Sequence, residues 1–390
     1  MASDSIRKPI CVDLFCGAGG LSEGLRLAGY NSVMAVDLDG NSLETYQYNH
    51  PNTRVINADI SGLSGAAIID ACEGEELDLL AGGPSCQGFS THGKRDADDP
   101  RNFLFKQFIR IAEETQPKWV LIENVQGLLT YSKGYFRDLI VNELAAIGYQ
   151  TRAQLVNAVD YGVPQRRKRI FFIGNRIGSP ITFPEPTHGM FRGQKSFVTI
   201  GDAIGDLPLM NGEFNQNAWD YVSPPTCDFQ RYARQFSPTL TLHQANGMSE
   251  QARNVAQYIG EGEGLRAVPV EHLPERFKRM RRISSGELRK DCTTLYYRLD
   301  RTQPGYTITC YFRNVASGPF MHPLEDRSIS MREAARIMSF QDRYRFLGTG
   351  IPRQIGNAVP PLLARAMGRH ILACDCAVAN TIADSHFALV

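Results

Sequence analysis

Residues Ile10-Cys-Val-Asp-Leu-Phe15 lead directly into the glycine-rich turn Cys16-Gly-Ala-Gly-Gly20. An apolar run that stops at glycines predicts a buried strand followed by a tight loop. Apolar positions between Leu21 and Ala28 then have the spacing of a short helix. We therefore expect this stretch to form a strand-loop-helix unit whose loop a ligand can approach closely.

The same alternation of strands and helices continues to about residue 175. Further buried strands are predicted at 33–36, 54–57, 77–81, 119–122 and 169–173, and helices at 42–49, 103–114 and 135–147. Strands that alternate with helices predict a parallel sheet covered on both faces. The expected fold class is therefore α/β, with a doubly wound, mostly parallel sheet.

The chain has 390 residues, which suggests more than one domain. Between about 178 and 320 prolines become frequent, long periodic helices are few, and short β-like pieces occur at 239–242, 295–299 and 306–312. This change predicts a second, smaller and partly β domain. Beyond it, Ser330-x-x-Glu333 is a capping box that begins a helix, and Pro360-Pro361 begins another of about fifteen residues that ends near Cys374.

The composition argues against several classes of protein. Hydrophobic residues make up 43% of the chain and charged residues 21%, as in a folded globular protein. No apolar run is long enough to span a membrane, and the first residues lack the pattern of a signal peptide, so we expect a cytoplasmic protein. Nine scattered cysteines without a C-x-x-C pair disfavour a zinc ribbon and a disulfide scaffold.

Charge is distributed unevenly, although the net charge is only +1. Residues 1–100 contain 6 basic and 15 acidic side chains, whereas residues 276–301 contain 9 basic and 3 acidic ones. A basic region in the second half is typical of a surface that binds nucleic acid. A solvated charged surface is the alternative.

Acidic and glycine-rich segments stand at the expected carboxyl ends of the first three strands, where ligands bind in open α/β sheets. Position 22 is serine where a dinucleotide fingerprint requires glycine, which weakens the case for a nicotinamide cofactor. Asp37, 20 residues beyond Gly17, is placed to hold ribose hydroxyls, and Asp59 is placed to bind an adenine amino group. A nucleoside ligand without pyrophosphate is implied, and S-adenosylmethionine is the commonest such cofactor. The alternative is a set of turn glycines and helix-capping aspartates.

A second loop, Gly82-Gly-Pro-Ser-Cys86-Gln-Gly-Phe-Ser90, follows the predicted strand at 77–81. Most lone cysteines are small buried hydrophobes. Cys86 instead follows a Gly-Gly-Pro turn, where backbone amides and nearby cations lower the pKa of a thiol, so we interpret it as a nucleophile. The polar, helix-poor residues 91–102 have the composition of a mobile lid.

Two further loops carry charged side chains. Glu123 ends a buried strand, where partial desolvation is expected to keep it protonated near neutral pH for hydrogen bonding to a base. In Gln165-Arg-Arg-Lys-Arg169, the strand period places Gln165, Arg167 and Arg169 on one face and the residues between them on the other. One face is suited to a site, and an edge strand protected by charge is the alternative.

Taken in order, these motifs resemble the DNA (cytosine-5-)-methyltransferase family of bacteria and phages. The matching segments are D-L-F-C-G-A-G-G at 13–20, G-G-P-S-C-Q-G-F-S at 82–90, E-N-V at 123–125, Q-R-R-K-R at 165–169, R-E-A-A-R-I-M-S-F at 332–340 and Q-I-G-N-A-V-P-P at 354–361. The segment at 198–208 also looks like the family's approach to its target-recognition region. Ser85 is a small departure, since many members have a second proline there.

The resemblance implies an enzyme that methylates carbon 5 of a cytosine within a specific double-stranded DNA sequence. Its methyl donor would be S-adenosylmethionine and its product S-adenosylhomocysteine, with no metal. Cys86 would attack carbon 6 of the ring, Glu123 would bind the flipped base, and Arg167 would hold the ring carbonyl, with Arg169 in the same catalytic set. A base inside a duplex is out of reach of these groups, so flipping is required.

By the same resemblance, Phe15 stacks on the adenine of the cofactor, Asp37 holds its ribose, and Asp59 with Ile60 recognises the adenine edge. The implied cofactor set is Phe15, Gly17, Gly19, Gly20, Leu21, Asp37, Leu38, Asp59, Ile60, Pro84, Leu104, Asn357 and Val359. The expected DNA contacts are Gln87, Ser90, Lys94, Arg95, Arg279, Arg281 and Arg282.

The implied fold is that of the Rossmann-like, class I methyltransferases that use S-adenosylmethionine. Residues 1–178 would form the catalytic and cofactor-binding domain and 179–325 the smaller target-recognition domain. Residues 326–352 would form a connecting helical region, and 353–390 a C-terminal helix that returns to the catalytic domain. Nothing in residues 180–320 identifies the DNA sequence that is recognised.

Rival interpretations are a relative that acts on tRNA and a catalytically dead DNA-binding scaffold. The long central region favours DNA over tRNA, and the presence of Cys86 and of the cofactor glycines disfavours a dead relative. We expect a monomer whose partner is double-stranded DNA, located in the cytoplasm and at the nucleoid, without membrane contact. A restriction-modification, phage-defence or epigenetic role is expected, with a cognate restriction or defence system as a possible partner.

Overall fold

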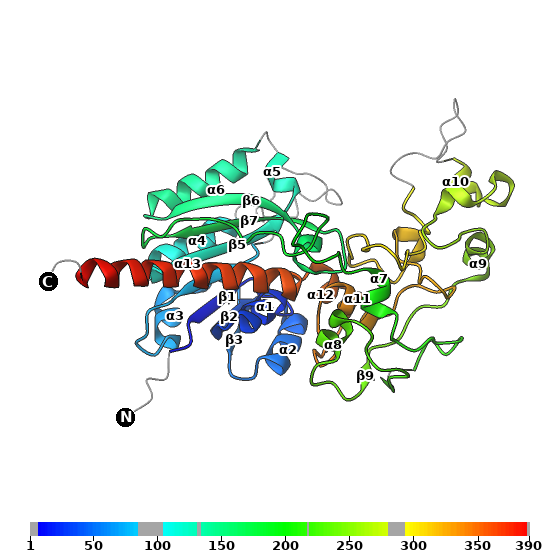
Figure 1. The fold of residues 1–390 in the computed structure, drawn as a ribbon, viewed down its shortest axis with the longest axis horizontal. Helices are drawn as coiled ribbons and strands as arrows, with labels where there is room; N and C mark the ends of the chain where they lie inside the picture. Colours follow the sequence, from blue (N-terminus) through cyan, green and yellow to red (C-terminus); the bar gives the residue numbers. More distant parts are fainter. Residues whose placement is uncertain (1–6, 85–103, 131–133, 217, 280–292, 388–390) are drawn as a thin grey trace. The chain divides into compact units, whose positions relative to one another are not determined.

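The computed structural model describes residues 7–84, 104–130, 134–216, 218–279 and 293–387, with side chains up to Cys376 in the last helix (Figure 1). These residues form two compact units. The first unit consists of Met1–Tyr161, Lys168–Thr187 and Ala358–Val390, and the second of Gly162–Arg167 and His188–Asn357.

A seven-stranded sheet forms the centre of the first unit, with the strand order β3-β2-β1-β4-β5-β7-β6. The first five strands of this order are parallel, and β7 is antiparallel to both β5 and β6. The predicted doubly wound, mostly parallel sheet is therefore confirmed. Its strands are β1 (Ile10–Leu14), β2 (Asn31–Asp37), β3 (Arg54–Asn57), β4 (Leu79–Gly82), β5 (Trp119–Val125), β6 (Gln150–Asn157) and β7 (Lys168–Asn175).

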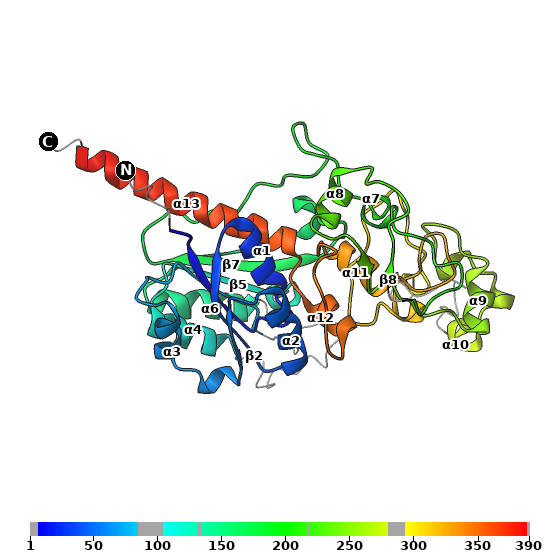
Figure 2. The same cartoon turned by 90° about the horizontal axis from the view of Figure 1, so that it is seen from below.

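Helices cover both faces of this sheet (Figures 1 and 2). One face packs a large apolar core against α3 (Gly65–Ala71), α4 (Leu104–Thr115) and α6 (Tyr135–Ala146). The other face carries α1 (Gly20–Ala28), α2 (Gly40–Asn49) and α13 (Pro361–Phe387), and α13 packs along α1. Shorter elements of this unit are α5 (Gly127–Thr130) and the 3-10 turns η1 (Ile60–Gly62) and η5 (Ala158–Tyr161).

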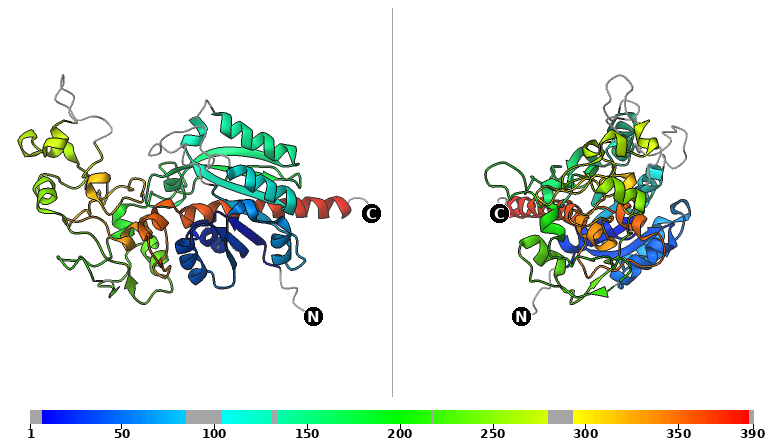
Figure 3. Two further views of the ribbon diagram at one scale, coloured as in Figure 1. Left: turned by 180° about the vertical axis from the view of Figure 1, so that it is seen from behind. Right: turned by 90° about the vertical axis from the view of Figure 1, so that its right-hand side faces the viewer.

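The packing of α13 on α1 depends on a glycine. A Cβ at Gly24 would lie 2.3 Å from Cβ of Ala364 and 2.5 Å from the carbonyl oxygen of Pro361, so no larger residue fits. Trp119 Nε1 also donates to Asp375 on α13 at 3.2 Å. The helix is 27 residues long and extends past the sheet (Figure 3), so the predicted length of about fifteen residues is wrong.

Register aligns the carboxyl ends of the parallel strands in one row. Leu14 at the end of β1 pairs with Val36 of β2 and with Gly82 of β4, and Gly82 pairs in turn with Ile122 of β5. The strand order reverses between β1 and β4, which is the topological switch point where ligands bind in such sheets. The loops after β1 and β4 therefore meet where a site is expected.

The second unit has little regular structure. Its helices are α7 (Ile200–Ile204), α8 (Asp228–Arg234), α9 (Glu250–Ala256), α10 (Glu275–Lys278), α11 (Met331–Ile337) and α12 (Ile351–Asn357), with 3-10 turns η6 (Leu265–Ala267), η7 (Val270–His272) and η9 (Val315–Ser317). A two-stranded sheet pairs β8 (Ala218–Trp219) with β9 (Leu240–Thr241). The predicted strand at 239–242 is thus confirmed in part, whereas 295–299 and 306–312 form no strand, and Arg298 makes only an isolated bridge there.

Buried charges hold much of the second unit together. The predicted capping box of Ser330 and Glu333 is present at the start of α11. Glu333 also accepts two hydrogen bonds from the fully buried Arg327, both 2.8 Å long. Arg336, on the same helix, forms ion pairs with Asp206 and Asp342, and all three side chains are buried. The segment 332–340, noted in the sequence as a motif, thus forms a charged core.

Candidate active site

The loop after β1 begins with a strained residue. Phe15 has φ 61°, a left-handed conformation that side chains rarely adopt. The next residue, Cys16, donates its amide to Val36 O of β2 at 3.2 Å, and Gly17 and Gly19 also have positive φ. Such strain costs about 1–3 kcal/mol and concentrates at functional sites. The backbone therefore places the Phe15 ring at the carboxyl edge of the sheet.

Asp37 ties this loop to the end of β2. Its Oδ2 accepts the amide of Gly17 at 2.8 Å, and its Oδ1 accepts the amide of Asp39 at 2.8 Å. Leu38 between these acids is 71% exposed, so its apolar surface is open to a ligand. The structure thus brings together two of the segments that the sequence assigned to a nucleoside site.

Asp59 and Ile60 follow β3, next in the same row of strand ends. Asp59 caps η1 by accepting from the Ser61 amide and hydroxyl, each at 2.8 Å, and these bonds lower the pKa of its exposed carboxyl. Ile60 is buried, and its carbonyl accepts from Arg110 of α4 at 2.9 Å. Leu104, the first residue of α4, is partly buried against the apolar core.

A buried carboxyl lies beneath the glycine loop, and the sequence analysis assigned it no role. Asp13 Oδ2 accepts from Ser22 Oγ at 2.6 Å, and Ser22 Oγ accepts from Tyr46 at 2.7 Å. Asp13 Oδ1 is buried and has no hydrogen-bond partner in the part of the chain that the structure describes. Burial, with a contribution from Asp37, raises the pKa of Asp13 to about 7. The sequence did contain a signal for this buried carboxyl, because Asp13 is the one acidic residue within the apolar run 10–15.

The loop after β4 begins with two glycines that bring three strands close together. A Cβ at Gly82 would lie 2.5 Å from Leu14 O of β1, and a Cβ at Gly83 would lie 3.3 Å from the Glu123 carboxylate of β5. Asn124 Nδ2 then donates to Pro84 O at 3.1 Å. The Gly-Gly-Pro turn is thereby anchored beside Glu123, two residues before Cys86. The sequence did not predict that Asn124 anchors this turn.

Glu123 forms an ion pair with Arg169, with 2.8 Å between Oε1 and Nε. Both side chains are largely buried, and burial lowers the pKa of Arg169 while Glu123 opposes that shift. The carboxyl that the sequence predicts to be protonated near neutral pH thus has a guanidinium as its neighbour, and its protonation state stays a prediction. Glu123 and Arg169, both expected in the catalytic set, are thus in contact on the neighbouring strands β5 and β7.

The segment Gln165–Arg169 alternates as the sequence predicted. Gln165 and Arg167 are buried and Arg169 is largely buried, whereas the residues between them are exposed. Arg167 belongs to the second unit, where its guanidinium donates to Ile308 O and Gly356 O, each at 2.9 Å. These bonds give Arg167 a role in joining segments of the second unit, in addition to the contact with a ring carbonyl that the resemblance implies.

Several predicted site residues lie outside the described residues. They are Cys86, Gln87, Ser90, Lys94, Arg95, Arg281 and Arg282. Among the other predicted residues, Arg279 is exposed directly after α10, Asn357 ends α12 in the second unit, and Val359 is buried in the first unit.

In the part of the chain that the structure describes, no three or more His, Cys, Asp or Glu side chains are grouped so that they could hold a metal ion. Within the same residues, no helix has the length and apolar character needed to cross a membrane.

Comparison with known proteins gives consistent matches over most of the chain. Residues 10–373 match the family model described as C-5 cytosine-specific DNA methylase. Type II methyltransferase M1.HphI of Haemophilus parahaemolyticus is 35% identical over 366 residues, which cover 93% of this chain and 86% of that protein. Type II methyltransferase M.DdeI of Desulfomicrobium norvegicum is 34% identical over 373 residues, covering 92% and 88%.

Solved structures show the same architecture. A protein described as a DNA modification methyltransferase encoded within an E. coli prophage has a TM-score of 0.73 at 26% identity, covering 94% of this chain and 99% of that one. The S. pombe Dnmt2 methyltransferase has a TM-score of 0.55 at 16% identity, which shows the fold alone. The family match, the curated relatives and the arrangement at the switch point agree, and the chain belongs to the C-5 cytosine-specific DNA methylase family.

Proposed function

We propose that this chain transfers a methyl group from S-adenosylmethionine to carbon 5 of a cytosine within a specific double-stranded DNA sequence. One observation carries the assignment to particular residues. The Gly82–Pro84 turn that leads to Cys86 is anchored by Asn124 next to the Glu123–Arg169 pair, at the switch point of the sheet. This arrangement supports the proposal that Cys86, two residues beyond Pro84 in the sequence, is the nucleophile and that Glu123 binds the base.

The residues after β1, β2 and β3 fit S-adenosylmethionine. Asp37 presents a carboxylate tied to the glycine loop, Leu38 presents an open apolar surface, and Asp13 Oδ1 is a buried acceptor without a hydrogen-bond partner among the described residues. These groups suit a ribose, an adenine ring and a ligand with a positive charge, respectively. When bound, the cofactor supplies an electrophilic methyl group. Phe15, Asp59, Ile60, Pro84 and Leu104 from this unit complete the proposed set, with Asn357 and Val359.

The proposed chemistry explains why a cysteine and an acid are needed. Carbon 5 of cytosine is a weak nucleophile, and addition of the Cys86 thiolate to carbon 6 turns the ring into an enamine, which is a strong one. Glu123 in its protonated form gives a proton to ring nitrogen 3 as negative charge develops there, and Arg169 stabilises the carboxylate that remains. After carbon 5 has gained the methyl group, loss of its proton breaks the bond between carbon 6 and sulfur and releases Cys86.

Arg169 positions the acid in the first unit, and Arg167 positions backbone within the second unit. Arg169 holds Glu123 at 2.8 Å on the neighbouring strand, and Arg167 holds the segments that contain Ile308 and Gly356. The base must leave the duplex to meet Cys86 and Glu123, which costs a few kcal/mol. Contacts to phosphates and base edges from the second unit and from 87–95 are proposed to offset that cost.

Bisulfite sequencing of DNA from cells that express the chain tests the activity and identifies the recognised sequence. A duplex with 5-fluorocytosine at the target position then tests the mechanism, because fluorine cannot leave as a proton does. The expected result is a covalent adduct that survives denaturing electrophoresis, maps to the Cys86 peptide and is lost in Cys86→Ser. The exposed thiol of Cys376 provides the matched control, Cys376→Ser, which keeps the adduct. An adduct on Cys16, whose pKa burial raises, contradicts the mechanism.

Finer expectations about the biological setting extend this proposal. The similarity to Type II methyltransferases supports a role in restriction-modification, phage defence or epigenetic marking, alongside a cognate restriction or defence system. A monomer in the cytoplasm, associated with the nucleoid through DNA, is the expected form. Gel filtration with light scattering checks the monomer, and a survey of neighbouring genes checks the partner system.

A further inference from the structure

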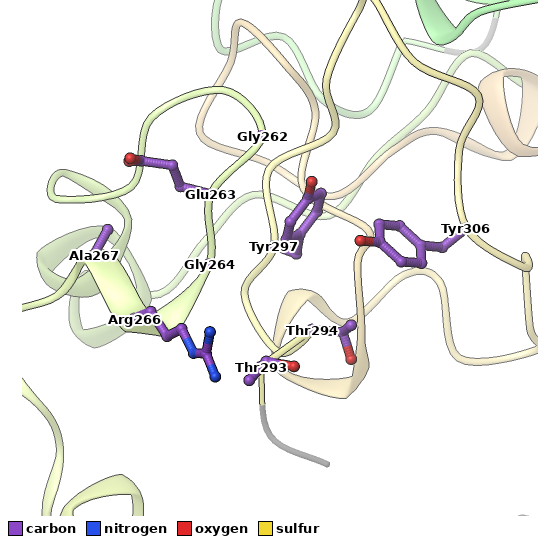
Figure 4. A pocket seen from close by; sticks show the side chains of 9 residues that line it. All are labelled: Gly262, Glu263, Gly264, Arg266, Ala267, Thr293, Thr294, Tyr297 and Tyr306. Carbon is purple, nitrogen blue, oxygen red and sulfur yellow. The ribbon is translucent and has the colours of Figure 1, made fainter. Parts of the chain in front are cut away.

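Two hollows adjoin one another in the second unit, beside a stretch without helix or strand. The larger, about 450 Å³, is bounded by Arg266, Thr294, Tyr297 and Tyr306 among others (Figure 4). The smaller, about 230 Å³, is bounded by Arg166 and again by the two tyrosines. The tyrosine pair is therefore the wall that the hollows share.

Glycines allow the backbone to build this wall. A Cβ on Gly264 would lie 2.8 Å from Thr293 O and 3.4 Å from Cδ2 of Tyr297, so another residue would push these segments apart. Gly262 has φ +79° and donates its amide to Arg298 O at 3.1 Å. Arg298 is buried, and its guanidinium donates to three further backbone carbonyls. The hollow is thus held in shape by buried bonds.

The two rings are arranged edge to face. Their centroids are 5.1 Å apart at an interplanar angle of 77°. Tyr306 is 39% exposed, and its ring borders the hollow in Figure 4. Burial, with Tyr306 as the next cause, raises the pKa of Tyr297 to about 12, so its phenol stays neutral. A partly exposed, neutral aromatic ring at a hollow is a surface on which a flat ligand can pack.

Positive charge flanks the tyrosine pair on both sides. Arg266 is exposed, and no ion pair involves it within the described part of the chain. Glu263 on the same wall accepts the Gly260 amide at 2.9 Å, and in Figure 4 its side chain points away from the tyrosines. Arg166 donates to Pro304 O at 2.8 Å, and among the described residues no carboxylate pairs with it. Asp300 also lines the smaller hollow, where its carboxylate accepts from the amide and hydroxyl of Thr302. Among the described residues neither arginine is in an ion pair, so both can bind anions.

We propose that these hollows form a nucleotide subsite for the DNA strand, with a base packed on Tyr306 and the flanking phosphates bound by Arg266 and Arg166. The inference rests on the proposed function, since DNA is the substrate that supplies these groups. An aromatic face between two cations matches a base between two phosphates. Both faces of a base in an intact DNA duplex are covered by its neighbours. A base that packs on Tyr306 must therefore have lost one stacked neighbour, as happens next to a flipped nucleotide.

Hydrogen bonds link this subsite to the segment that contains the proposed catalytic arginine. Thr307, next to Tyr306, donates its hydroxyl to Arg166 O at 2.9 Å. Ile308 N donates to Gln165 Oε1 at 3.0 Å, and its carbonyl accepts from Arg167 at 2.9 Å. A nucleotide that binds at Tyr306 would therefore contact a segment whose backbone is hydrogen-bonded to Gln165, Arg166 and Arg167.

Photo-cross-linking tests where the base lies. Duplexes that contain the sequence found by bisulfite sequencing have 5-iododeoxyuridine at one position each around the target cytosine. They are irradiated with the full chain and S-adenosylhomocysteine, and the adducts are mapped by mass spectrometry. We expect adducts on Tyr306 or Tyr297 from only one or two positions. Adducts confined to Tyr311, which is 60% exposed but lines neither hollow, overturn the proposal.

Variants separate the ring from its hydroxyl. Tyr306→Ala is expected to weaken DNA binding by about tenfold, because base–aromatic stacking is lost. Tyr306→Phe keeps the ring and is expected to bind DNA like the parent chain, as is the matched control Tyr311→Ala. Affinity for S-adenosylhomocysteine and thermal unfolding report folding in each variant. Equal losses in Tyr306→Phe and Tyr306→Ala contradict packing of a base on the ring.

Salt dependence tests the phosphate contact. Arg266→Gln is expected to reduce the slope of log affinity against log salt by about 0.9, the value for one phosphate. Arg253→Gln removes the same charge from an exposed position of α9 outside both hollows and leaves the slope unchanged. If the parent chain methylates DNA and Arg266→Gln keeps the parental slope, the proposed phosphate contact is wrong while the proposed methyltransferase function stands. If the parent chain forms no 5-methylcytosine, the proposed function fails with it.

Discussion

Both units of the chain contain an apolar core, and the second also depends on a cluster of buried charges. In the first, strands of apolar residues pack between layers of helices around a core of Val, Ile, Leu and Phe side chains. In the second, three arginines, Arg327, Arg332 and Arg336, have no exposed surface and hold the segments around α11 through ion pairs and carbonyls. An apolar core produces periodic sequence, whereas a charged core produces isolated motifs. Sequence patterns therefore describe the first unit better than the second.

The largest expected effect comes from breaking the charged core of the second unit. Arg336→Met removes the buried cation that Asp206 and Asp342 share, and leaves Asp206 with Arg234 and Asp342 with the more distant Arg332. The loss is expected to cost up to about 3–5 kcal/mol of unfolding free energy. Urea unfolding measures it, with Trp119→Phe as background so that Trp219 of the second unit is the only tryptophan.

The exposed pair of Arg231 and Asp228 provides the matched control for that experiment. Arg231→Met is expected to change the free energy of unfolding by no more than about 0.5 kcal/mol, because exposed ion pairs contribute little. Equal effects of the two arginine substitutions would show that the buried charges stabilise the second unit no more than an exposed ion pair does.

Prediction from the sequence succeeded where burial is regular. The strands β2, β3, β4 and β5 were located because each contains a short apolar run, and β7 because apolar residues follow the charged segment 165–169. The strand β6 was missed because Gln150–Asn157 alternates polar residues and is exposed or half-buried along most of its length. The prediction of strands at 295–299 and 306–312 was wrong. Most of these residues are buried or half-buried, but their backbone is irregular.

The candidate site was predicted as a row of strand ends, but not as a set of contacts. Local glycines and acids indicated the loops, since those features lie within one segment. The bond from Asn124 to Pro84 and the Glu123–Arg169 pair depend on which strands are neighbours. The chain from Asp13 through Ser22 to Tyr46 likewise joins three elements. Such contacts follow from strand order and register, which composition and periodicity do not determine.

The next largest effect is expected on cofactor binding in the first unit. Asp37→Ala removes the acceptor of the Gly17 amide and the proposed ribose contact, so affinity for S-adenosylhomocysteine should fall at least tenfold, at about 1–3 kcal/mol for a lost charged hydrogen bond. Phe15→Ala should act in the same direction. DNA affinity should change much less. Calorimetry measures both ligands, and Asp70→Ala, at an exposed acid of the same unit, is the control. Unchanged cofactor affinity in both variants would place the pocket elsewhere.

Acidification should weaken the second unit before the first. Burial is the first cause that lowers the pKa of His322, to about 4, and burial also lowers the pKa of His243. Because the unfolded chain binds more protons in this range, the histidines stabilise the fold fully above about pH 6.5, and stability falls as the pH drops towards 4. Arg327 and the histidines lower the pKa of Glu333, which adds a loss in the same direction at lower pH.

Urea unfolding followed through Trp219 between pH 7.5 and 5 checks this dependence. His322→Gln should flatten the pH dependence, whereas His272→Gln, at an exposed histidine of the same unit, should not. A parent chain whose second unit is equally stable at both ends of this range would show that the buried histidines are not linked to folding.

The smallest expected effect is on the salt dependence of DNA binding at the basic stretch near residue 280. Arg279 is exposed directly after α10 and is the one residue of the predicted trio, with Arg281 and Arg282, that the structure describes. Arg279→Gln should weaken DNA binding a few-fold and lower the slope of log affinity against log salt by up to about 0.9, because one phosphate contact releases about one counterion. A parallel titration of Arg192→Gln, at another exposed arginine of the second unit, gives the effect of net charge alone. If the two variants lower the slope equally, Arg279 acts through long-range charge and contacts no phosphate. If Arg279→Gln alone lowers it, the irregular unit binds the DNA backbone through this stretch, in a region where the sequence showed charge but no periodic structure.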